Sequence, residues 1–160
     1  YVDRADFMEV PVKGYFRLFP GNEVRFKGAY FLKCEEIVKD EKGEVVELIC
    51  SYDPETKSGT SFTGRKVKGT IHWVDAEQAV DITVNAYDTL MKDSEDGESV
   101  LNPDSLTVYH AKAEPSVLEM KEGQRCQFFR HGYYIRDEKL SRPEHQVFTR
   151  IVDLKSSWKK

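Results

Sequence analysis

Hydrophobic and polar residues alternate along this chain in short runs, and a period of two is typical of β-strands. Each run is bounded by Gly, Pro, Asn or Asp, which are residues that favour turns. Almost no stretch shows the helical period of 3.6. The runs that predict strands most clearly are residues 29–38, 45–52, 80–90, 105–113 and 146–154. Many short strands at near-regular spacing indicate an all-β barrel or sandwich.

Turn signals place some of these strands beside one another. The polar turn at residues 39–44 predicts a hairpin between residues 29–38 and 45–52. A second hairpin is predicted within residues 123–136, with its turn at residues 130–132.

Other segments have a less regular pattern. The turn Pro20–Asn22 separates residues 15–19 from residues 24–27, and we expect these two segments to be adjacent strands. Residues 66–74 are expected to form a further strand, and residues 92–98 an acidic, flexible stretch.

The chain has 160 residues, enough for one ordinary domain or two small ones. The best candidate boundary lies around residues 75–80, where Asp75 can cap one helical turn. We therefore expect a first unit in residues 1–75 and a second in residues 76–160. The last strand, near residues 146–155, is expected to return to a barrel.

The distribution of charge matters more than its sum. The net charge is −4, which argues weakly against a nucleic-acid binder. Residues 11–34, however, carry five basic residues and only one acidic residue, Glu23. Acidic residues cluster elsewhere, for example at residues 93–98. A basic strip on an acidic body is what local contact with phosphate groups needs.

Several functions are disfavoured. No stretch of about 18 apolar residues predicts a membrane helix, and no signal-peptide pattern opens the chain. The three cysteines are far apart and the four histidines lack HxxxH or HExxH spacing, so we expect neither a disulfide framework nor a metal site. Reduced cysteines fit the cytosol. No P-loop, GxGxxG or GxSxG motif is present, so no catalytic residue is predicted. A start at Tyr1 rather than Met suggests a piece of a longer protein.

Residues 15–27 combine cations with aromatic rings. Arg17 and Arg25 carry planar guanidinium groups that can pair bidentately with the edge of a base such as guanine, and Lys27 adds a further cation. Aromatic rings beside them can stack on unpaired bases. A solvated strand face over an aromatic core gives the same pattern, and on pattern alone that interpretation is favoured.

Two further groups of residues stand out. Gln127 offers a donor and an acceptor that suit a Watson–Crick edge, and Arg130 precedes a turn from which a long side chain can reach outward. An ordinary surface hairpin is the alternative. His72 lies beside Trp73, and we interpret this pair as structural because no nucleophile with a base is nearby in the pattern.

Taken together, three segments resemble glutaminyl-tRNA synthetases. They are residues 7–11 with 14–22 (FMEVP and GYFRLFPGN), residues 64–74 (GRKVKGTIHWV) and residues 127–134 (QFFRHGYY). Two shorter matches, residues 101–106 (LNPDSL) and 113–116 (AEPS), follow in the right order between them. Five ordered matches over nearly the whole chain are far more specific than any one of them.

The resemblance implies two tandem β-barrels of the ribosomal protein L25-like type that hold a splayed anticodon loop. It implies that Arg17 contacts the third anticodon base, and that Gln127 and Arg130 contact the middle base. Arg25 and Lys27 are then expected at the first base and its neighbouring phosphate.

Two positions depart from the pattern of the family. Lys27 stands where relatives can carry Arg, which puts a bidentate contact in question, and Phe129 stands where relatives can carry an acid, which alters the expected pocket of the middle base.

The resemblance also implies that the parent enzyme joins glutamine to tRNA with ATP and Mg²⁺, both bound in an N-terminal catalytic domain. This chain would bind the anticodon loop of glutamine tRNA without a cofactor or metal and be inactive alone. It is expected to be monomeric and cytoplasmic, with no membrane partner.

Three alternatives remain open. An anticodon-binding barrel of an archaeal or eukaryotic glutamyl-tRNA synthetase would share the fold, although the YFRLFPG segment looks more like the glutaminyl branch. A free-standing L25-like protein that binds rRNA would also share it, but the ordered matches disfavour it. An interaction module that binds no nucleic acid suits the net charge of −4 but leaves the basic strip unexplained.

Overall fold

The computed structural model describes residues 1–154 of the chain, and strands dominate it. The expected all-β class is confirmed. The strands are β1 (Glu23–Phe26), β2 (Phe31–Lys39), β3 (Val45–Asp53), β4 (Thr70–Ile71), β5 (Val80–Tyr87), β6 (Met91–Asp93), β7 (Ser99–Leu101), β8 (Leu106–Ala113), β9 (Arg125–Phe128), β10 (Gly132–Arg136) and β11 (Gln146–Asp153). Three short 3₁₀ helices join them, η1 (Arg4–Asp6), η2 (Pro54–Thr56) and η3 (Pro115–Glu119).

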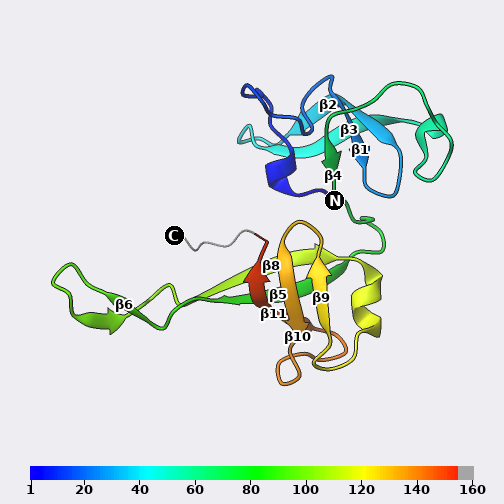
Figure 1. Ribbon diagram of the computed structural model, residues 1–160. Coiled ribbons are helices and arrows are strands. Elements are labelled where there is room, and N and C mark those ends of the chain that lie inside the picture. The colour runs from blue at the N-terminus through cyan, green and yellow to red at the C-terminus, as the bar shows by residue number, and fades with distance from the viewer. Residues whose placement is uncertain (155–160) are drawn as a thin grey trace. The chain divides into compact units, whose positions relative to one another are not determined.

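The chain divides into two units, one from Tyr1 to Trp73 and one that begins at Val74 (Figure 1). The first unit contains a four-stranded sheet in the order β3-β2-β1-β4. Strands β2 and β3 pair as an antiparallel hairpin, as the turn at residues 39–44 predicts. Strand β1 pairs antiparallel with β2 and parallel with β4, so both of its edges are occupied.

The predicted strand at residues 15–19 is wrong. Within this segment Leu18 alone forms a bridge, and its partner is Phe7 rather than a residue of β1. The backbone N–H of Leu18 donates to the Asp6 carbonyl at 3.0 Å, and the N–H of Met8 donates to the Leu18 carbonyl at 3.1 Å. Because β2 and β4 already pair with β1, residues 15–19 find their backbone partners in the segment after η1 instead.

Gly69 allows three segments of the first unit to converge. Its carbonyl accepts a hydrogen bond from the Arg25 N–H at 2.9 Å. A Cβ atom placed on Gly69 would lie 1.8 Å from the carbonyl oxygen of Phe16, which is rigid backbone. Residues 15–19, β1 and the approach to β4 therefore meet only because Gly69 has no side chain.

The core of the first unit combines side chains from β1, β2 and β4 with the bridged residues Phe7 and Leu18. Its buried side chains are Phe7, Leu18, Val24, Cys34 and Ile71. Burying each of the larger ones contributes about 1.5–3 kcal/mol relative to leaving it exposed.

Cys34 and Cys50 lie opposite each other on β2 and β3. Burial, and to a smaller extent the nearby Cys34, raise the pKa of the Cys50 thiol to about 11. Burial also raises the pKa of Cys34. Both cysteines are free, and at neutral pH both thiols stay protonated, so they pack as small apolar groups.

The second unit contains a five-stranded sheet in the order β8-β5-β11-β10-β9. Strand β5 lies between β8 and β11, and residues 82–86 are buried without interruption. The alternation seen in the sequence therefore understates how deeply this strand is buried, because both of its faces are covered. Strand β11 runs parallel to β5, with Phe148 opposite Val84, and thus brings the end of the described chain into the middle of the sheet.

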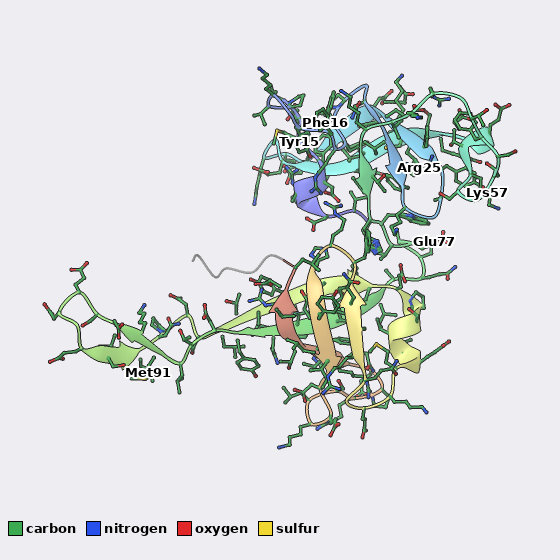
Figure 2. The ribbon with its side chains drawn as sticks, viewed as in Figure 1. Tyr15, Phe16, Arg25, Lys57, Glu77 and Met91 are labelled. Carbon is green, nitrogen blue, oxygen red and sulfur yellow. The ribbon has the colours of Figure 1, made fainter. Side chains whose placement is uncertain are left out.

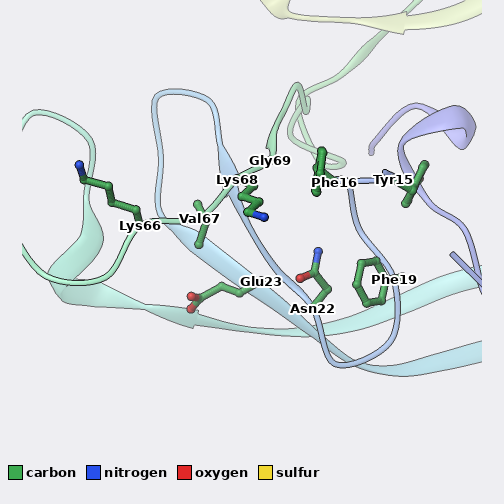
Figure 3. A pocket seen from close by; sticks show the side chains of 9 residues that line it. All are labelled: Tyr15, Phe16, Phe19, Asn22, Glu23, Lys66, Val67, Lys68 and Gly69. Atoms are coloured by element: carbon green, nitrogen blue, oxygen red, sulfur yellow. The ribbon is translucent and has the colours of Figure 1, made fainter. Parts of the chain in front are cut away.

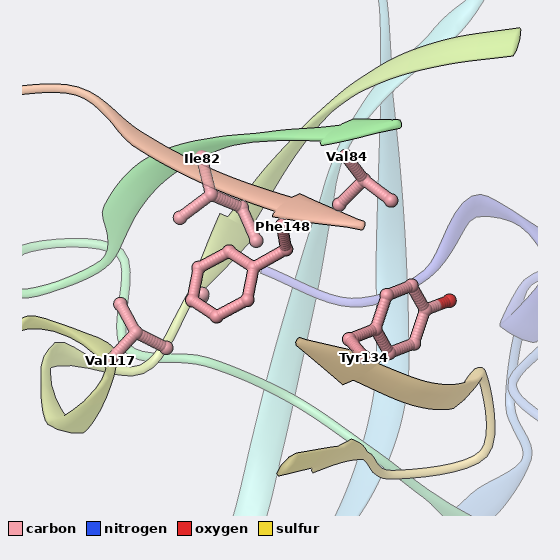
Figure 4. Packing of buried hydrophobic residues seen from close by; sticks show 6 residues of the cluster. Ile82, Val84, Val117, Tyr134 and Phe148 are labelled. Carbon is pink, nitrogen blue, oxygen red and sulfur yellow. The ribbon is translucent and has the colours of Figure 1, made fainter. Parts of the chain in front are cut away.

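A second hydrophobic core supports this sheet. Ile82, Val84, Val117, Tyr134 and Phe148 pack together in it (Figure 4). The Phe148 side chain is fully buried, and the Phe128 ring contacts it edge-on at a centroid distance of 5.1 Å. The β9–β10 hairpin that carries residues 127–134 is thus fixed to a packed core.

Two expectations about short segments need correction, and a third is confirmed. The acidic stretch at residues 92–98 is the tip of a hairpin, because β6 and β7 pair antiparallel there (Figure 1). Of residues 66–74, only Thr70–Ile71 form a strand. The helical turn expected after Asp75 is present: the Asp75 carboxylate accepts hydrogen bonds from the N–H groups of Glu77 and Gln78, and the Asp75 carbonyl accepts one from the Ala79 N–H at 2.9 Å, four residues on.

The paired strands of residues 1–154 form open sheets rather than closed barrels. The edge strands are β3 and β4 in the first unit and β8 and β9 in the second, and no pairing joins either couple within the described chain. The L25-like barrel expectation therefore holds for the all-β class and not for closure of the hydrogen-bonded sheets.

We expect Gly69→Ala to lower the free energy of unfolding by about 1–3 kcal/mol, because its methyl group would be forced against the Phe16 carbonyl. Urea denaturation measures the change. Thr70→Ala is the control, since Thr70 is the exposed neighbour of Gly69. Equal stability of the two variants would contradict the close backbone contact.

Candidate nucleic-acid interface

Arg17 is paired with a buried acid, Asp6. The guanidinium Nη1 of Arg17 forms an ion pair with the Asp6 carboxylate, whose side chain is only 1% exposed, while the Arg17 side chain is 40% exposed. A buried carboxylate is stable only with a partner, so Asp6 fixes where the guanidinium lies. The Arg17 side chain nevertheless stays partly open to solvent.

The local backbone explains why these two groups meet. Asp6 ends η1, and the hydrogen bond from the Leu18 N–H to the Asp6 carbonyl holds residues 6 and 17 on neighbouring segments. The Asn22 side-chain amide donates to the Arg17 carbonyl at 2.7 Å, which fixes the backbone on the other side. A guanidinium group has five N–H donors, so the pairing with Asp6 leaves donors for a further acceptor.

Arg25 lies on β1 against an aromatic ring. Its guanidinium carbon lies 4.3 Å from the ring centroid of Phe31, which is buried, and its Nη1 donates to Ser58 Oγ at 3.3 Å. Stacking on Phe31 and the bond to Ser58 restrict the side chain to few rotamers. A planar, restricted guanidinium loses less entropy when it binds a base or phosphate.

Arg65 ties the loop before β4 to the sheet. It forms two hydrogen bonds with the Glu23 carboxylate, at 2.8 and 2.6 Å, and an ion pair with Asp53 at 2.8 Å. The hydrogen bond from Arg65 and that from the Glu55 N–H hold the pKa of Asp53 below its usual value. Two carboxylates thus neutralise Arg65, so we assign this residue to structure rather than to RNA contact.

Lys27 follows β1, and its side chain is exposed. Its backbone N–H donates to the Ile71 carbonyl at 3.0 Å, and its carbonyl accepts a hydrogen bond from Trp73 Nε1 at 3.0 Å. Trp73 also packs against Phe26, with ring centroids 6.0 Å apart. Trp73 therefore has a structural role: it helps to hold the backbone of Lys27 in place.

A cavity of about 420 Å³ opens on the first unit between residues 15–19 and residues 66–69. The rings of Tyr15, Phe16 and Phe19 line one side of it, and Lys66 and Lys68 belong to the other side (Figure 3). Arg17 is not among the residues that line the cavity. Tyr15 and Phe16 lie together, apart from Arg25 (Figure 2).

Gln127 and Arg130 belong to the β9–β10 hairpin of the second unit. Gln127 is exposed on β9, opposite Tyr133 of β10. Arg130 lies in the turn and has a φ of 71°, in the left-handed region that residues with a Cβ rarely adopt. Such a conformation costs about 1–2 kcal/mol and is often found at functional sites.

The predicted site residues fall into two sets. Arg17, Arg25 and Lys27 belong to the first unit, where Arg25 and Lys27 lie on or next to β1 and Arg17 lies on a separate segment. Gln127 and Arg130 belong to the second unit. The role of each of these residues in RNA binding stays a prediction.

Sequence patterns did not identify Asp6 or the cavity. A single aspartate in a polar segment carries no period, so nothing distinguishes its burial. The cavity depends on the contact between residues 15–19 and residues 66–69, which are distant in the sequence. The one local sequence signal for the cavity is the pair of lysines on either side of Val67, followed by Gly69.

In residues 1–154, no group of three or more His, Cys, Asp or Glu is placed to hold a metal ion. Over the same residues, no helix has the length and apolar character needed to cross a membrane.

Comparison with known proteins gives two family matches. Residues 1–53 and residues 70–137 each match a model described as an anti-codon binding domain of class I tRNA synthetases (E and Q). The chain is also similar to proteins named glutamine–tRNA ligase. Identity is 54% for the one from Clostridium perfringens, 50% for that from Clostridioides difficile and 46% for that from Nitrosomonas europaea. These alignments cover 99–100% of the chain but only 30% of each relative's length.

We expect Arg17→Ala to lower the free energy of unfolding by about 1–3 kcal/mol, because it leaves the buried Asp6 carboxylate without its ion pair with Arg17. Asp6→Asn in the Arg17→Ala background should recover much of this loss, since the buried charge is then removed. Urea denaturation of both variants and of Asp6→Asn measures the coupling.

The control for this coupling is Lys39→Ala, which breaks the exposed ion pair of Lys39 with Glu9 at 2.7 Å and should change stability by less than about 0.5 kcal/mol. Additive effects of Asp6→Asn and Arg17→Ala would show that the two side chains do not depend on each other.

Proposed function

The chain belongs to the anticodon-binding domains of the class I tRNA synthetases for glutamate and glutamine, and we propose that it binds the anticodon loop of glutamine tRNA. The observation that carries this proposal is the similarity to glutamine–tRNA ligases over 99% of the chain. The names of these relatives favour glutamine over glutamate as the cognate amino acid.

The proposal extends to a longer protein, because the chain spans 30% of the length of its relatives. In that protein a catalytic domain would bind ATP and Mg²⁺ and join glutamine to the tRNA. We propose that this chain supplies binding energy for the tRNA and discrimination between anticodons, and that it carries out no catalytic step of its own. We propose that the protein works in the cytoplasm, where translation occurs, and that it is a monomer.

The proposed contacts come from the resemblance to the family, and the positions of the side chains support them. Arg17 would use the N–H donors that Asp6 leaves available to pair with the third anticodon base. Arg25, stacked on Phe31, and the exposed Lys27 would serve the first base and its phosphate. Phosphate contacts supply affinity that depends on salt, whereas base contacts supply discrimination.

The second unit would contribute the contacts to the middle base. Gln127 is exposed and can donate and accept at the same time, which matches a Watson–Crick edge. The left-handed backbone of Arg130 is a cost that a contact with RNA would explain. Phe129 offers a ring rather than a charge beside this pair.

The main experiment titrates a labelled anticodon stem-loop of glutamine tRNA with the chain at two salt concentrations. We expect tighter binding at low salt, and an affinity loss of about tenfold or more when the middle base is changed, as a base contact worth about 1–3 kcal/mol predicts. Equal affinity for both loops would reject specific recognition of the anticodon.

A second experiment separates base contact from bulk charge. In the Asp6→Asn background, Arg17→Ala should weaken binding to the cognate loop by about fivefold or more beyond the effect of Lys33→Ala. Both substitutions remove one positive charge, and Lys33 is paired with Glu35 at 3.0 Å on an exposed surface. Comparable losses would mean that the basic strip acts only through its charge.

Arg130→Gly tests the cost of the turn. Glycine adopts a φ of 71° without strain, so the variant should keep its stability or gain up to about 1 kcal/mol. Binding of the cognate loop should nevertheless fall about tenfold, because the guanidinium is lost. Unchanged affinity, measured by fluorescence anisotropy beside thermal unfolding, would remove Arg130 from the interface.

A further inference from the structure

The cavity of the first unit has the features of a site for a nucleobase. It holds about 420 Å³, a size within the range of roughly 300–1,000 Å³ for ligand sites. Phe16 on its wall is 51% exposed, which is unusual for a phenylalanine and leaves its aromatic ring accessible from solvent. Aromatic faces in basic grooves are the usual stacking platforms for unpaired bases.

The charges around the cavity favour a phosphate. Lys66 and Lys68 both line it, and both side chains are exposed. The one acid on the wall, Glu23, has each carboxylate oxygen bonded to Arg65, at 2.8 and 2.6 Å. Arg65 is shared between Glu23 and Asp53, so these three groups together carry one negative charge, and the two lysines still make the surroundings of the cavity positive.

We propose that this cavity holds one unpaired nucleotide of the bound RNA, with its base stacked on Phe16 and its phosphate beside Lys68. This inference rests on the proposed function and adds a subsite to it. Arg17 does not line the cavity. The cavity therefore holds either a nucleotide other than the one whose base Arg17 contacts, or another face of that same base.

The ammonium group of Lys68 lies over the Phe16 ring in the free chain. Its Nζ lies 5.0 Å from the ring centroid. A cation–π contact at an exposed site is worth about 0.5–1 kcal/mol, whereas a base stacked on an aromatic side chain is worth about 1–3 kcal/mol. A base therefore displaces the ammonium from the ring, and the flexible lysine is then close enough to pair with a phosphate.

Polar and rigid groups complete the site. The amide of Asn22 donates to the Arg17 carbonyl through Nδ2, so its Oδ1 is oriented as an acceptor on the cavity wall. Gly69 sets the distance between the two walls, because its Cα packs against the Phe16 carbonyl. Both walls are thus fixed by the backbone, and the site exists before RNA binds.

The test uses anticodon stem-loops in which one loop nucleotide at a time is made abasic. Fluorescence anisotropy compares the unsubstituted chain with Phe16→Ala. One loop position should cost about tenfold in affinity when it is abasic in the unsubstituted chain, and nothing further in Phe16→Ala. Phe16→Tyr should restore that difference, because tyrosine keeps the aromatic face. Lys68→Ala should lower the slope of log affinity against log salt by about 1.

The control is Tyr87→Ala, which removes an aromatic side chain that is 54% exposed in the second unit, on β5. It should leave the abasic profile unchanged. The same abasic profile for the unsubstituted chain and Phe16→Ala, with specific anticodon binding intact, overturns the cavity proposal alone. Failure of the unsubstituted chain to distinguish anticodons overturns the proposed function as well.

Discussion

The close approach of two backbones at Gly69 is the constraint on which the interface of the first unit depends. The missing side chain lets the Phe16 carbonyl lie against Gly69, while the Gly69 carbonyl accepts the Arg25 N–H. This single point brings together the segment of Arg17, the strand of Arg25 and the lysines before β4. The Gly69 contact also creates the cavity, since its two walls are the segments that meet there.

Charge balance then decides which cations are available to RNA. Arg65 is consumed by Glu23 and Asp53, and its pKa is raised by the hydrogen bonds that they accept. Arg17 also has a carboxylate partner, the buried Asp6, but the Arg17 side chain is 40% exposed, so it stays accessible while the ion pair holds its guanidinium in place. A net charge of −4 is thus compatible with RNA binding, because the acids near the interface act on particular arginines rather than on the RNA.

The strands with strong alternation could be predicted from the sequence, and those defined by distant contacts could not. Residues 29–38 and 45–52 form the predicted hairpin, and β8 and β11 begin within one residue of the predicted limits. Residues 15–19 have the composition of a strand, but both edges of β1 are already paired, so the segment bonds to residues 6–8 instead. The cations could be named from the resemblance, whereas the burial of Asp6 depends on packing that no local pattern records.

The most direct test of the account is to map RNA contact residue by residue. Backbone amide chemical shifts of the ¹⁵N-labelled chain would be followed during titration with the anticodon stem-loop of glutamine tRNA. The largest changes are expected at residues 15–19, 25–27, 66–69 and 127–131, in both units at the same RNA concentration. Changes confined to one unit, or centred on the β2–β3 and β6–β7 hairpins, would contradict it.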